Sequence, residues 1–399
     1  MTEKRSHLFA FPHTFNQKDH ARVIRELQLS GATGVNLALN YHASRDFLLR
    51  QGPSLEYLSD GFHYYKPNFS RYPEGSFTPS SDDHWASNEM LDSLLESARE
   101  AGFSIAAWGV FLHNSAIGRS HRNATVTNAL GNHFLSELCP LNPRVRGYVL
   151  GLVADLSSRG ISAIAIESLH FHGARHGEHH ERFFLEMSPT TEFLFSLCFC
   201  SSCIDAFNKS GGDGEHLRGK ISSSLRPFLD DEDPWLRMNL TKGHLVEILG
   251  EEILQFLHMR ENALTALYQS VSEAAHSANV KLRLVDQTPL INSSDPKPLD
   301  SSWLVGIDYE KIQHFVDAYT PLIYRESADE VETLTRHYRE RISQEIIPIL
   351  RPTYPDNRSQ KELVEKVARI RALEIDEVDF YLLDTMRPRD LDWIKQSLS

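Results

Sequence analysis

Short apolar runs alternate with amphipathic stretches along the whole chain. The apolar runs lie at 8–11, 33–39, 103–111, 161–168, 280–285, 316–324, 346–350 and 378–383. Between them, apolar residues recur with the helical period at 17–29, 88–101, 143–158, 244–277, 328–343 and 360–373. Short apolar runs separated by helices are typical of strands buried in a parallel sheet. The pattern therefore predicts an α/β protein built from strand–helix units.

Eight such units are the number that closes a (β/α)8 TIM barrel. An open doubly wound sheet is the alternative, but it usually carries a glycine-rich loop after its first strand, and FPHTFN has none. We predict one barrel domain over residues 1–399. Long insertions follow strand two (41–87) and strand four (169–240), and we expect both over the C-terminal face, where barrel active sites lie.

Composition narrows the function classes. The 399 residues are 41% hydrophobic and 24% charged, as in ordinary globular proteins. A net charge of −13 with no visible basic face argues against a nucleic-acid partner. No apolar run reaches the roughly 18 residues of a membrane span, and the first residues lack a signal-peptide core, so we expect a cytoplasmic protein without a membrane partner. Homo-oligomerisation stays open.

Polar residues at the ends of the predicted strands, His42 and Gln287 among them, are the candidates for chemistry. Glu167 ends the apolar run IAIE, where burial would raise its pKa and suit it to general acid catalysis. Glycoside hydrolysis needs a second carboxylate, and Asp286 and Asp384 are equally placed for it, or for structural ion pairs. The residues expected to bind or stack on a substrate are Asn40, Tyr64, Tyr65, Trp108, His113, Asn114, His170, His172, His176, Tyr324 and Arg351.

Two segments contain residues that commonly bind metals. Five of the 20 histidines lie between His170 and His180, beside carboxylates, but their spacing matches no standard zinc template. Further along, C-x-C-x-x-C presents three thiols that a fourth ligand could complete to a tetrahedral structural zinc site. Reduced thiols are the equal alternative. The cysteines concerned are Cys198, Cys200 and Cys203, with Cys139 as the fourth.

Between residues 100 and 205 the chain resembles a largely uncharacterised TIM-barrel family that is described as glycoside-hydrolase-like. The resemblance depends on AAWGVFLHNS, ELCPLNPRVRGYVLGLVADL, IAIESLHFHG, HGEHHE and LCFCSSC. It implies a pocket formed by Trp108, His113, Asn114, Glu167, His170, His172, His176, His179 and His180. Strand seven ends in Arg351-Pro352 without a carboxylate, so the pair of many retaining barrel glycosidases is incomplete here.

These observations favour a glycoside hydrolase or related carbohydrate-active enzyme with Glu167 as general acid/base and no required cofactor. One alternative is a metal-dependent lyase, isomerase or hydrolase that uses the histidine cluster. The other is a carbohydrate-binding barrel without catalytic activity. The substrate and the stereochemical outcome are not defined by the sequence.

Overall fold

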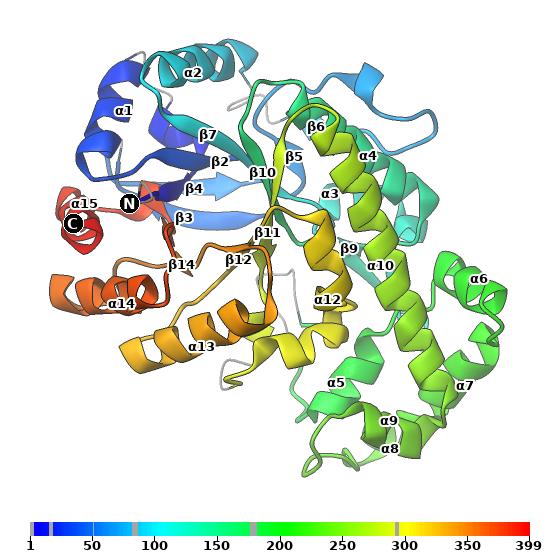
Figure 1. Ribbon diagram of the computed structural model, residues 1–399. Helices are drawn as coiled ribbons and strands as arrows, with labels where there is room; N and C mark the ends of the chain where they lie inside the picture. Colours follow the sequence, from blue (N-terminus) through cyan, green and yellow to red (C-terminus); the bar gives the residue numbers. More distant parts are fainter. Residues whose placement is uncertain (1–3, 16–18, 51, 82–86, 176–181, 292–294) are drawn as a thin grey trace.

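The computed structural model describes residues 4–15, 19–50, 52–81, 87–175, 182–291 and 295–399, and its centre is a curled parallel sheet (Figure 1). The strands run in the order β13-β12-β11-β10-β7-β2-β1-β15-β14. Their bounds are β1 (His7–Ala10), β2 (Gly34–Tyr41), β7 (Ser104–Val110), β10 (Ala163–Glu167), β11 (Lys281–Asp286), β12 (Ala318–Pro321), β13 (Glu345–Ile346), β14 (Ile349–Leu350) and β15 (Asp379–Phe380).

The seventh strand of the barrel is interrupted. Strand β13 pairs with β12, whereas β14 pairs with β15, and only Ile347 and Pro348 separate the two pieces. Ile347 N donates to Tyr319 O (2.8 Å), and Ile323 N donates to Ile349 O (3.0 Å). Both pieces thus follow β12 and connect it to β15, so the predicted α/β TIM-type barrel is confirmed.

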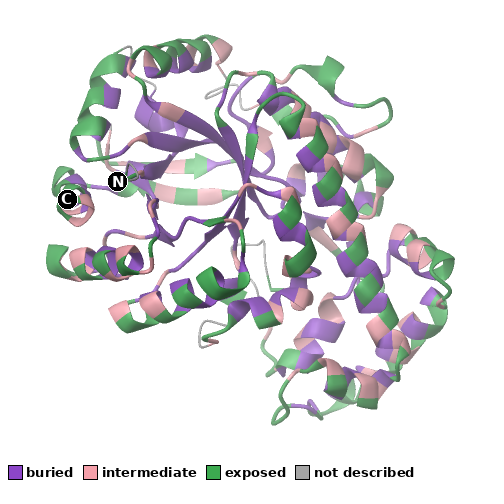
Figure 2. Ribbon diagram, in the orientation of Figure 1, coloured by how far each residue is buried: buried purple, intermediate pink, exposed green. Residues whose placement is uncertain are grey.

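Helices surround the strands, as the amphipathic stretches predict. They are α1 (His20–Leu29), α2 (Asn88–Glu100), α4 (Pro143–Ser157), α10 (Glu252–His276), α13 (Ala328–Arg341), α14 (Gln360–Ala372) and α15 (Pro388–Leu398). Ser87 and Asn142 cap α2 and α4 by accepting from backbone N–H groups of their first turns. Figure 2 shows buried strands in the middle and exposed outer faces on the helices.

The single helix expected over 244–277 is wrong. The segment forms α9 (Lys242–Leu249) and α10, which are separated at Gly250 and Glu251. Gly250 has φ +80°, a conformation that costs a glycine little and that favours the end of a helix. The 3.6-residue periodicity continues across the break because both helices bury apolar side chains.

Alternate residues of each strand enter two different cores. Ala165 and Val285 face the barrel interior together with Phe9 and Trp108. Ile166 and Leu284, which neighbour them in the chain, pack outward against the helices. This alternation is the property of a strand that decides which side chains face the barrel axis.

Three insertions add to the barrel. After β2 the chain forms a hairpin of β3 (Ser44–Leu48) and β4 (Ser54–Leu58), followed by β5 (Phe62–His63) and β6 (Ser80–Ser81). The sequence pattern did not reveal the insertion after β7, which contains α3 (Ser115–Ser120), β8 (Thr125–Thr127) and β9 (His133–Leu138). After β10, a helical lobe comprises α5 (Pro189–Ser196), α6 (Ser201–Lys209), α7 (Gly214–Ser224) and α8 (Arg226–Asp230).

The helical lobe has a hydrophobic core of its own. Leu194, Phe207, Leu217 and Ile221 pack there with Phe256 of α10. In Figure 1 the lobe projects at the lower right, beside the N-terminal end of α10. The predicted second insertion is therefore an ordered structural unit in its described residues, attached to the barrel through α10.

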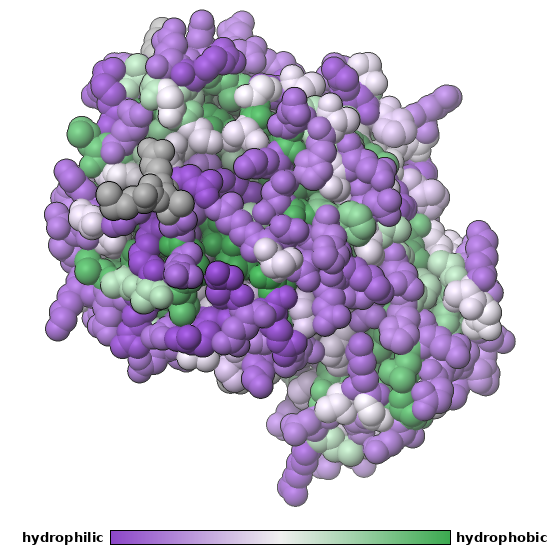
Figure 3. Space-filling view, in the orientation of Figure 1, coloured by the Kyte–Doolittle hydropathy of each residue, from purple (hydrophilic) through white to green (hydrophobic). Residues whose placement is uncertain are grey.

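The outer surface is largely hydrophilic in the view of Figure 3, and its apolar side chains show mostly in recesses between elements. None of the described helices is by itself long and apolar enough to cross a membrane. Helices α5 and α6 together meet the length and composition criteria, but they are bent by 92° relative to each other.

Candidate active site

Glu167 is the last residue of β10 and lies on the same side of that strand as Ala165, facing the barrel interior. Trp108 Nε1 donates a hydrogen bond to its Oε2 (2.6 Å), and Gln287 Nε2 donates to its Oε1 (2.8 Å). The residue is only 7% exposed. Burial raises the pKa of Glu167, whereas His42, Trp108 and Gln287 act in the opposite direction. This carboxyl is thus held in one orientation and holds its proton more tightly than an exposed glutamate does.

Trp108 does not offer a free ring face. Its centroid lies 5.1 Å from that of Phe9, 5.7 Å from Phe11 and 4.6 Å from Tyr41, and the side chain is 1% exposed. From its place at a strand end we expected Trp108 to stack on a sugar. Its position instead makes it a hydrogen-bond donor that orients Glu167.

Four imidazoles lie in a row near this carboxyl. The ring centroids are 5.2 Å apart for His42 and His113, 6.0 Å for His113 and His172, and 4.4 Å for His172 and His170. His170 Nε2 is 3.3 Å from Oε1 of Gln287, whose amide nitrogen binds Glu167. The row therefore reaches the carboxyl through Gln287. His176 lies outside the described residues, as do His179 and His180.

A second carboxyl borders the row of histidines. Asp60 Oδ2 accepts from Ser115 N (2.5 Å) and lies 4.0 Å from His113 Nε2. Its Oδ1 is buried and has no hydrogen-bond partner among the described residues. Burial raises the pKa of Asp60, and interaction with His42 lowers it. His42 interacts in the same way with Glu167, so it connects the two carboxyl groups electrostatically.

The backbone around Asp60 is fixed by a close contact. Gly61 has φ +73°, and a Cβ there would lie 2.1 Å from Oδ1 of Asn114. That oxygen accepts from Ile117 N (2.9 Å), and the Asn114 amide donates to Tyr148 Oη (3.4 Å). Asn114 was expected to bind substrate. In the structure it is 1% exposed, caps α3 and supports the loop of Asp60.

The two carboxylates proposed as partners of Glu167 are occupied elsewhere. Asp286 follows Leu284 on the outward side of β11, and its Oδ2 accepts from Tyr338 Oη of α13 (2.5 Å). Its Oδ1 accepts from Thr288 N (2.9 Å) and from the Thr288 hydroxyl.

Asp384 is likewise committed to the fold. It accepts from Phe11 N (2.7 Å) and from Thr14 Oγ1 (2.8 Å), and is 1% exposed. Burial raises its pKa to about 6. Both oxygens thus fix the turn after β1. The structure brings neither Asp286 nor Asp384 into contact with Glu167 among the hydrogen bonds of the described residues.

Other predicted substrate-binding residues serve the core. Tyr64 and Tyr65 are 0% exposed, so they cannot stack on a sugar. The guanidinium of Arg159 covers the ring of Tyr65 at 4.5 Å. Asn40 is 1% exposed and donates to the carbonyl of Val110, which ties β2 to β7. These three side chains therefore stabilise the interior of the protein and do not face a substrate.

Tyr324 and Arg351 remain close to the site. The Arg351 guanidinium lies 4.4 Å above the ring of Tyr324 and binds both oxygens of Asp356 (2.9 and 2.7 Å). The ring centroids of Tyr324 and Tyr381 are 6.0 Å apart, and the Tyr381 hydroxyl lies 3.1 Å from the hydroxyl of Tyr41. Burial is the main cause of the raised pKa of each of these three tyrosines, and interaction with Glu167 adds to it. The tyrosines therefore form the surroundings of Glu167, and Asp356 already compensates the charge of Arg351.

Among the described residues, two clusters have the proximity that a metal ion requires. One contains all four cysteines, and the other contains His7, Glu377 and Asp379. In the second cluster Arg283 Nη1 lies 2.6 Å from Glu377 and 3.7 Å from Asp379 and supplies the positive charge. His170 and His172 belong to neither cluster. In its described part, the histidine segment thus does not bring three such ligands within 4.8 Å of one another.

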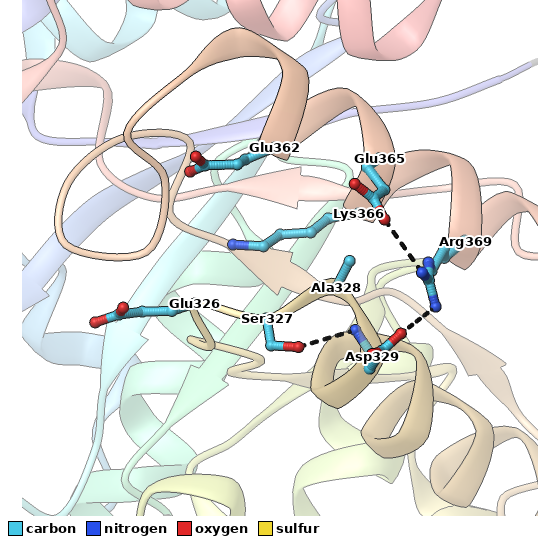
Figure 4. Close-up of a pocket in the computed structure, with 8 residues that line it drawn as sticks. All are labelled: Glu326, Ser327, Ala328, Asp329, Glu362, Glu365, Lys366 and Arg369. Carbon is cyan, nitrogen blue, oxygen red and sulfur yellow. Dashed lines mark hydrogen bonds and ion pairs between the residues drawn. The ribbon is translucent and has the colours of Figure 1, made fainter.

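A pocket between α13 and α14 lies outside this constellation (Figure 4). Its basic residue Arg369 is paired with Asp329, Glu332 and Glu365. Lys366, which also lines it, donates to the carbonyl oxygens of Arg325 and Asp356. Because these charges already have partners, we assign no catalytic function to this pocket.

Comparison with known proteins identifies the fold. No family model and no curated protein matches the chain. Among solved structures, the PgaB (BpsB) glycoside hydrolase domain of Bordetella bronchiseptica aligns with a TM-score of 0.59 at 12% identity, over 100% of this chain and 99% of that one. A β-galactosidase from the psychrophilic Marinomonas ef1 aligns with a TM-score of 0.57 at 9% identity, over 99% of this chain and 59% of that one.

An α-L-fucosidase from Paenibacillus thiaminolyticus gives a TM-score of 0.55 at 9% identity, over 100% of this chain and 49% of that one. The chain therefore spans roughly half the length of two of these enzymes. At such identities the likeness establishes a shared barrel fold. Catalytic residues have to be argued from the site itself.

Of the residues of this site, Asp60 was not predicted, whereas His42 and Gln287 were noted as strand-end residues without an assigned role. Gln287 follows Val285 by two positions, so strand alternation could have placed it on the side of Glu167. His42 directly follows β2, in keeping with its reading as a strand-end residue. Asp60 lies in an insertion whose path the sequence pattern does not define.

Proposed function

We propose that the protein hydrolyses glycosidic bonds, with Glu167 as the general acid that protonates the leaving oxygen. The observation that carries this proposal is the environment of that carboxyl. It ends a barrel strand, faces the interior, and is oriented by Trp108 and Gln287, while burial raises its pKa. A general acid needs these properties, because it must hold a proton at the working pH and deliver it in one direction.

The second group of the proposed mechanism is Asp60. It borders His113 and His42, and one of its oxygens is not engaged by any described residue. In this role Asp60 would accept a proton from the attacking water, or attack the sugar itself. Asp286 and Asp384 are less suitable, because their carboxylates accept hydrogen bonds from Tyr338, Phe11 and Thr14.

The histidine row would bind the sugar. Imidazoles of His170 and His172 are adjacent, and neutral imidazole both donates and accepts hydrogen bonds, as sugar hydroxyls do. Burial lowers the pKa of His170, so its uncharged form prevails at neutral pH. The barrel fold that this chain shares with glycoside hydrolases supports the proposed function by analogy.

The test compares substrates with good and poor leaving groups. Glu167→Gln should lower kcat/KM on unactivated glycosides by about 10²–10⁴-fold, the usual contribution of a general acid. Nitrophenyl or fluoride glycosides should lose much less, because their leaving groups need no proton. Asp60→Asn should impair both kinds of substrate.

Asp286→Asn is the matched control, since it removes an equally buried carboxylate and should leave kcat/KM of the folded enzyme nearly unchanged. Equal losses on both kinds of substrate for Glu167→Gln would contradict the assigned role. Saturable sugar binding without any product would favour the non-catalytic alternative. The anomer first released, followed by NMR, separates a base role of Asp60 (inversion) from a nucleophilic one (retention).

A further inference from the structure

All four cysteines of the chain converge on one point, although three elements supply them. Cys139 directly follows β9, Cys198 and Cys200 lie between α5 and α6, and Cys203 lies in the first turn of α6. Their sulfur atoms are all within 4.8 Å of one another. The Cys139 sulfur is 3.5 Å from that of Cys203 and 3.5 Å from that of Cys200.

These distances suit a shared metal ion. Four thiolates at about 2.3 Å from a tetrahedral Zn²⁺ have sulfur–sulfur separations of about 3.8 Å. A disulfide would need about 2.05 Å, and all four residues are free cysteines. The cluster is also shielded from water, since the exposed fractions are 0%, 1%, 7% and 0% for Cys139, Cys198, Cys200 and Cys203.

A buried cation that interacts electrostatically with the cysteines supplies an independent observation. Arg260 of α10 is 2% exposed, and its guanidinium lies 4.4 Å from the ring of Phe171. Only Nη2 makes a hydrogen bond, to Leu304 O (3.3 Å), while Nε and Nη1 have no partner among the described residues. Arg260 interacts electrostatically with Cys203, Cys198 and Cys139, and also with the neighbouring carboxylate of Glu261.

An arginine so poorly partnered needs negative charge nearby, because a buried cation without compensation is costly. The carboxylate of Glu261 is shared with Lys242, whose Nζ lies 3.4 Å from it, and four neutral thiols supply no charge. Four thiolates around one Zn²⁺ carry a net charge of −2, which would compensate Arg260 and leave the cluster anionic. The charge on α10 therefore favours an ionised, metal-bound cluster over four protonated cysteines.

We propose that Cys139, Cys198, Cys200 and Cys203 bind one structural Zn²⁺. A tetrahedral all-thiolate site has no open coordination position, so the ion would stabilise the fold and take no part in the reaction. This proposal does not depend on the proposed glycosidase function.

The ion would join two insertions that border the active site. Phe199 N donates to Thr127 O (2.6 Å), so the C-x-C segment already touches the β8–β9 hairpin. Strand β9 in turn supports the histidine row, because Asn114 N donates to Ser136 O (2.8 Å) and the backbone of His113 forms an antiparallel β-bridge with that of Glu137. Zinc at this point would fasten the helical lobe to the hairpin that positions His113.

The experiment measures metal and thiols on protein purified without a histidine tag. Elemental mass spectrometry should find one zinc per chain, and native protein should show no thiol that reacts quickly with a disulfide reagent. Since the chain has four cysteines, a mercurial that captures all four thiolates should release one equivalent of zinc. Protein that holds no zinc and takes up none when zinc is added during refolding would overturn the proposal.

Variants then locate the ion. Cys200→Ser should lose zinc and melt at a lower temperature, whereas Cys200→His should keep it, because three cysteines and one histidine also form tetrahedral zinc sites. Ser202→Ala changes the same loop without removing a ligand and should keep zinc and stability. If Cys200→Ser does not fold, Co²⁺-reconstituted wild type provides the readout, as tetrahedral thiolate ligation gives intense visible absorption. Zinc that persists undiminished in folded Cys200→Ser, or a weak octahedral cobalt spectrum, would place the metal elsewhere and refute the assignment.

Discussion

The hydrogen bond from Tyr338 to Asp286 provides a direct test of whether this aspartate belongs to the framework or to the chemistry. Both groups are buried, and Oη lies 2.5 Å from Oδ2. Replacing Tyr338 by Phe removes the donor and leaves a buried carboxylate oxygen without its partner. A hydrogen bond to a charged group contributes about 1.5–3 kcal/mol, so the free energy of unfolding should fall by about that amount.

The corresponding shift in melting temperature is small but measurable. An unfolding entropy of about 2.1 cal/mol/K per residue over 399 residues gives ~0.8 kcal/mol/K, so Tm should fall by about 2–4 °C. The assay is thermal and denaturant unfolding of wild type, Tyr338→Phe, Asp286→Asn and the double variant. In the double-mutant cycle the coupling energy between the two sites should reach at least about 1 kcal/mol.

Tyr319→Phe is the matched control for this cycle. Tyr319 is on the neighbouring strand, is equally buried, and its hydroxyl has no hydrogen-bond partner among the described residues. Its replacement should change stability by much less than Tyr338→Phe. Additive effects in the cycle, combined with loss of turnover in Asp286→Asn at unchanged stability, would refute the structural reading of Asp286.

Three further predictions concern the site and its supports. Trp108→Phe removes a hydrogen bond that stabilises the ionised form of Glu167, so the pKa of Glu167 should rise further. The limb of the pH–rate profile that reports the protonated carboxyl should then move to higher pH, and an unmoved profile would contradict the orienting role of Trp108. Burial raises the pKa of Asp384 from 3.8 to about 6, so the folded protein holds this proton more tightly than the unfolded chain, and the carboxyl stabilises the fold less as pH rises through that interval. The unfolding free energy of wild type relative to Asp384→Asn should therefore decline from pH 4 to 6, and a constant difference would disprove this. Gly61→Ala would place a Cβ against Asn114 at a positive φ, so it should displace Asp60 and reduce turnover. Gly75 has a similar φ with open space around it, so Gly75→Ala should show the effect of backbone strain alone.

Patterns along the chain defined the barrel and the position of Glu167. The apolar runs became strands because eight parallel strands, buried on both sides, need continuous apolar segments. Glu167 could be found because a carboxyl at the end of such a run is exceptional, and all strand ends meet at one face. The four cysteines also stood out, because C-x-C-x-x-C is a local spacing that presents three thiols within one short loop.

Roles that depend on contacts between distant segments could not be predicted. Tyr64 and Tyr65 sit in a long insertion and could equally be exposed platforms or core residues, and only the packing buried them. The choice among carboxylates depended on which side of a strand each one faces. Asp286 lies outward beside Tyr338, while Asp60 reaches His113 from an insertion 53 positions earlier in the chain.

Local sequence patterns were thus enough to predict the class of fold, the strands along the chain and the glutamate that ends the fourth of them. The partners of each polar group became clear only in the folded protein: Trp108 and Gln287 for Glu167, Tyr338 for Asp286, and Cys139 for the three other cysteines. This difference follows from the range of the interactions involved. Apolar periodicity is a local property of the chain, whereas a hydrogen bond or a ligand contact is made only when folding brings residues from separate segments within about 3–4 Å of each other.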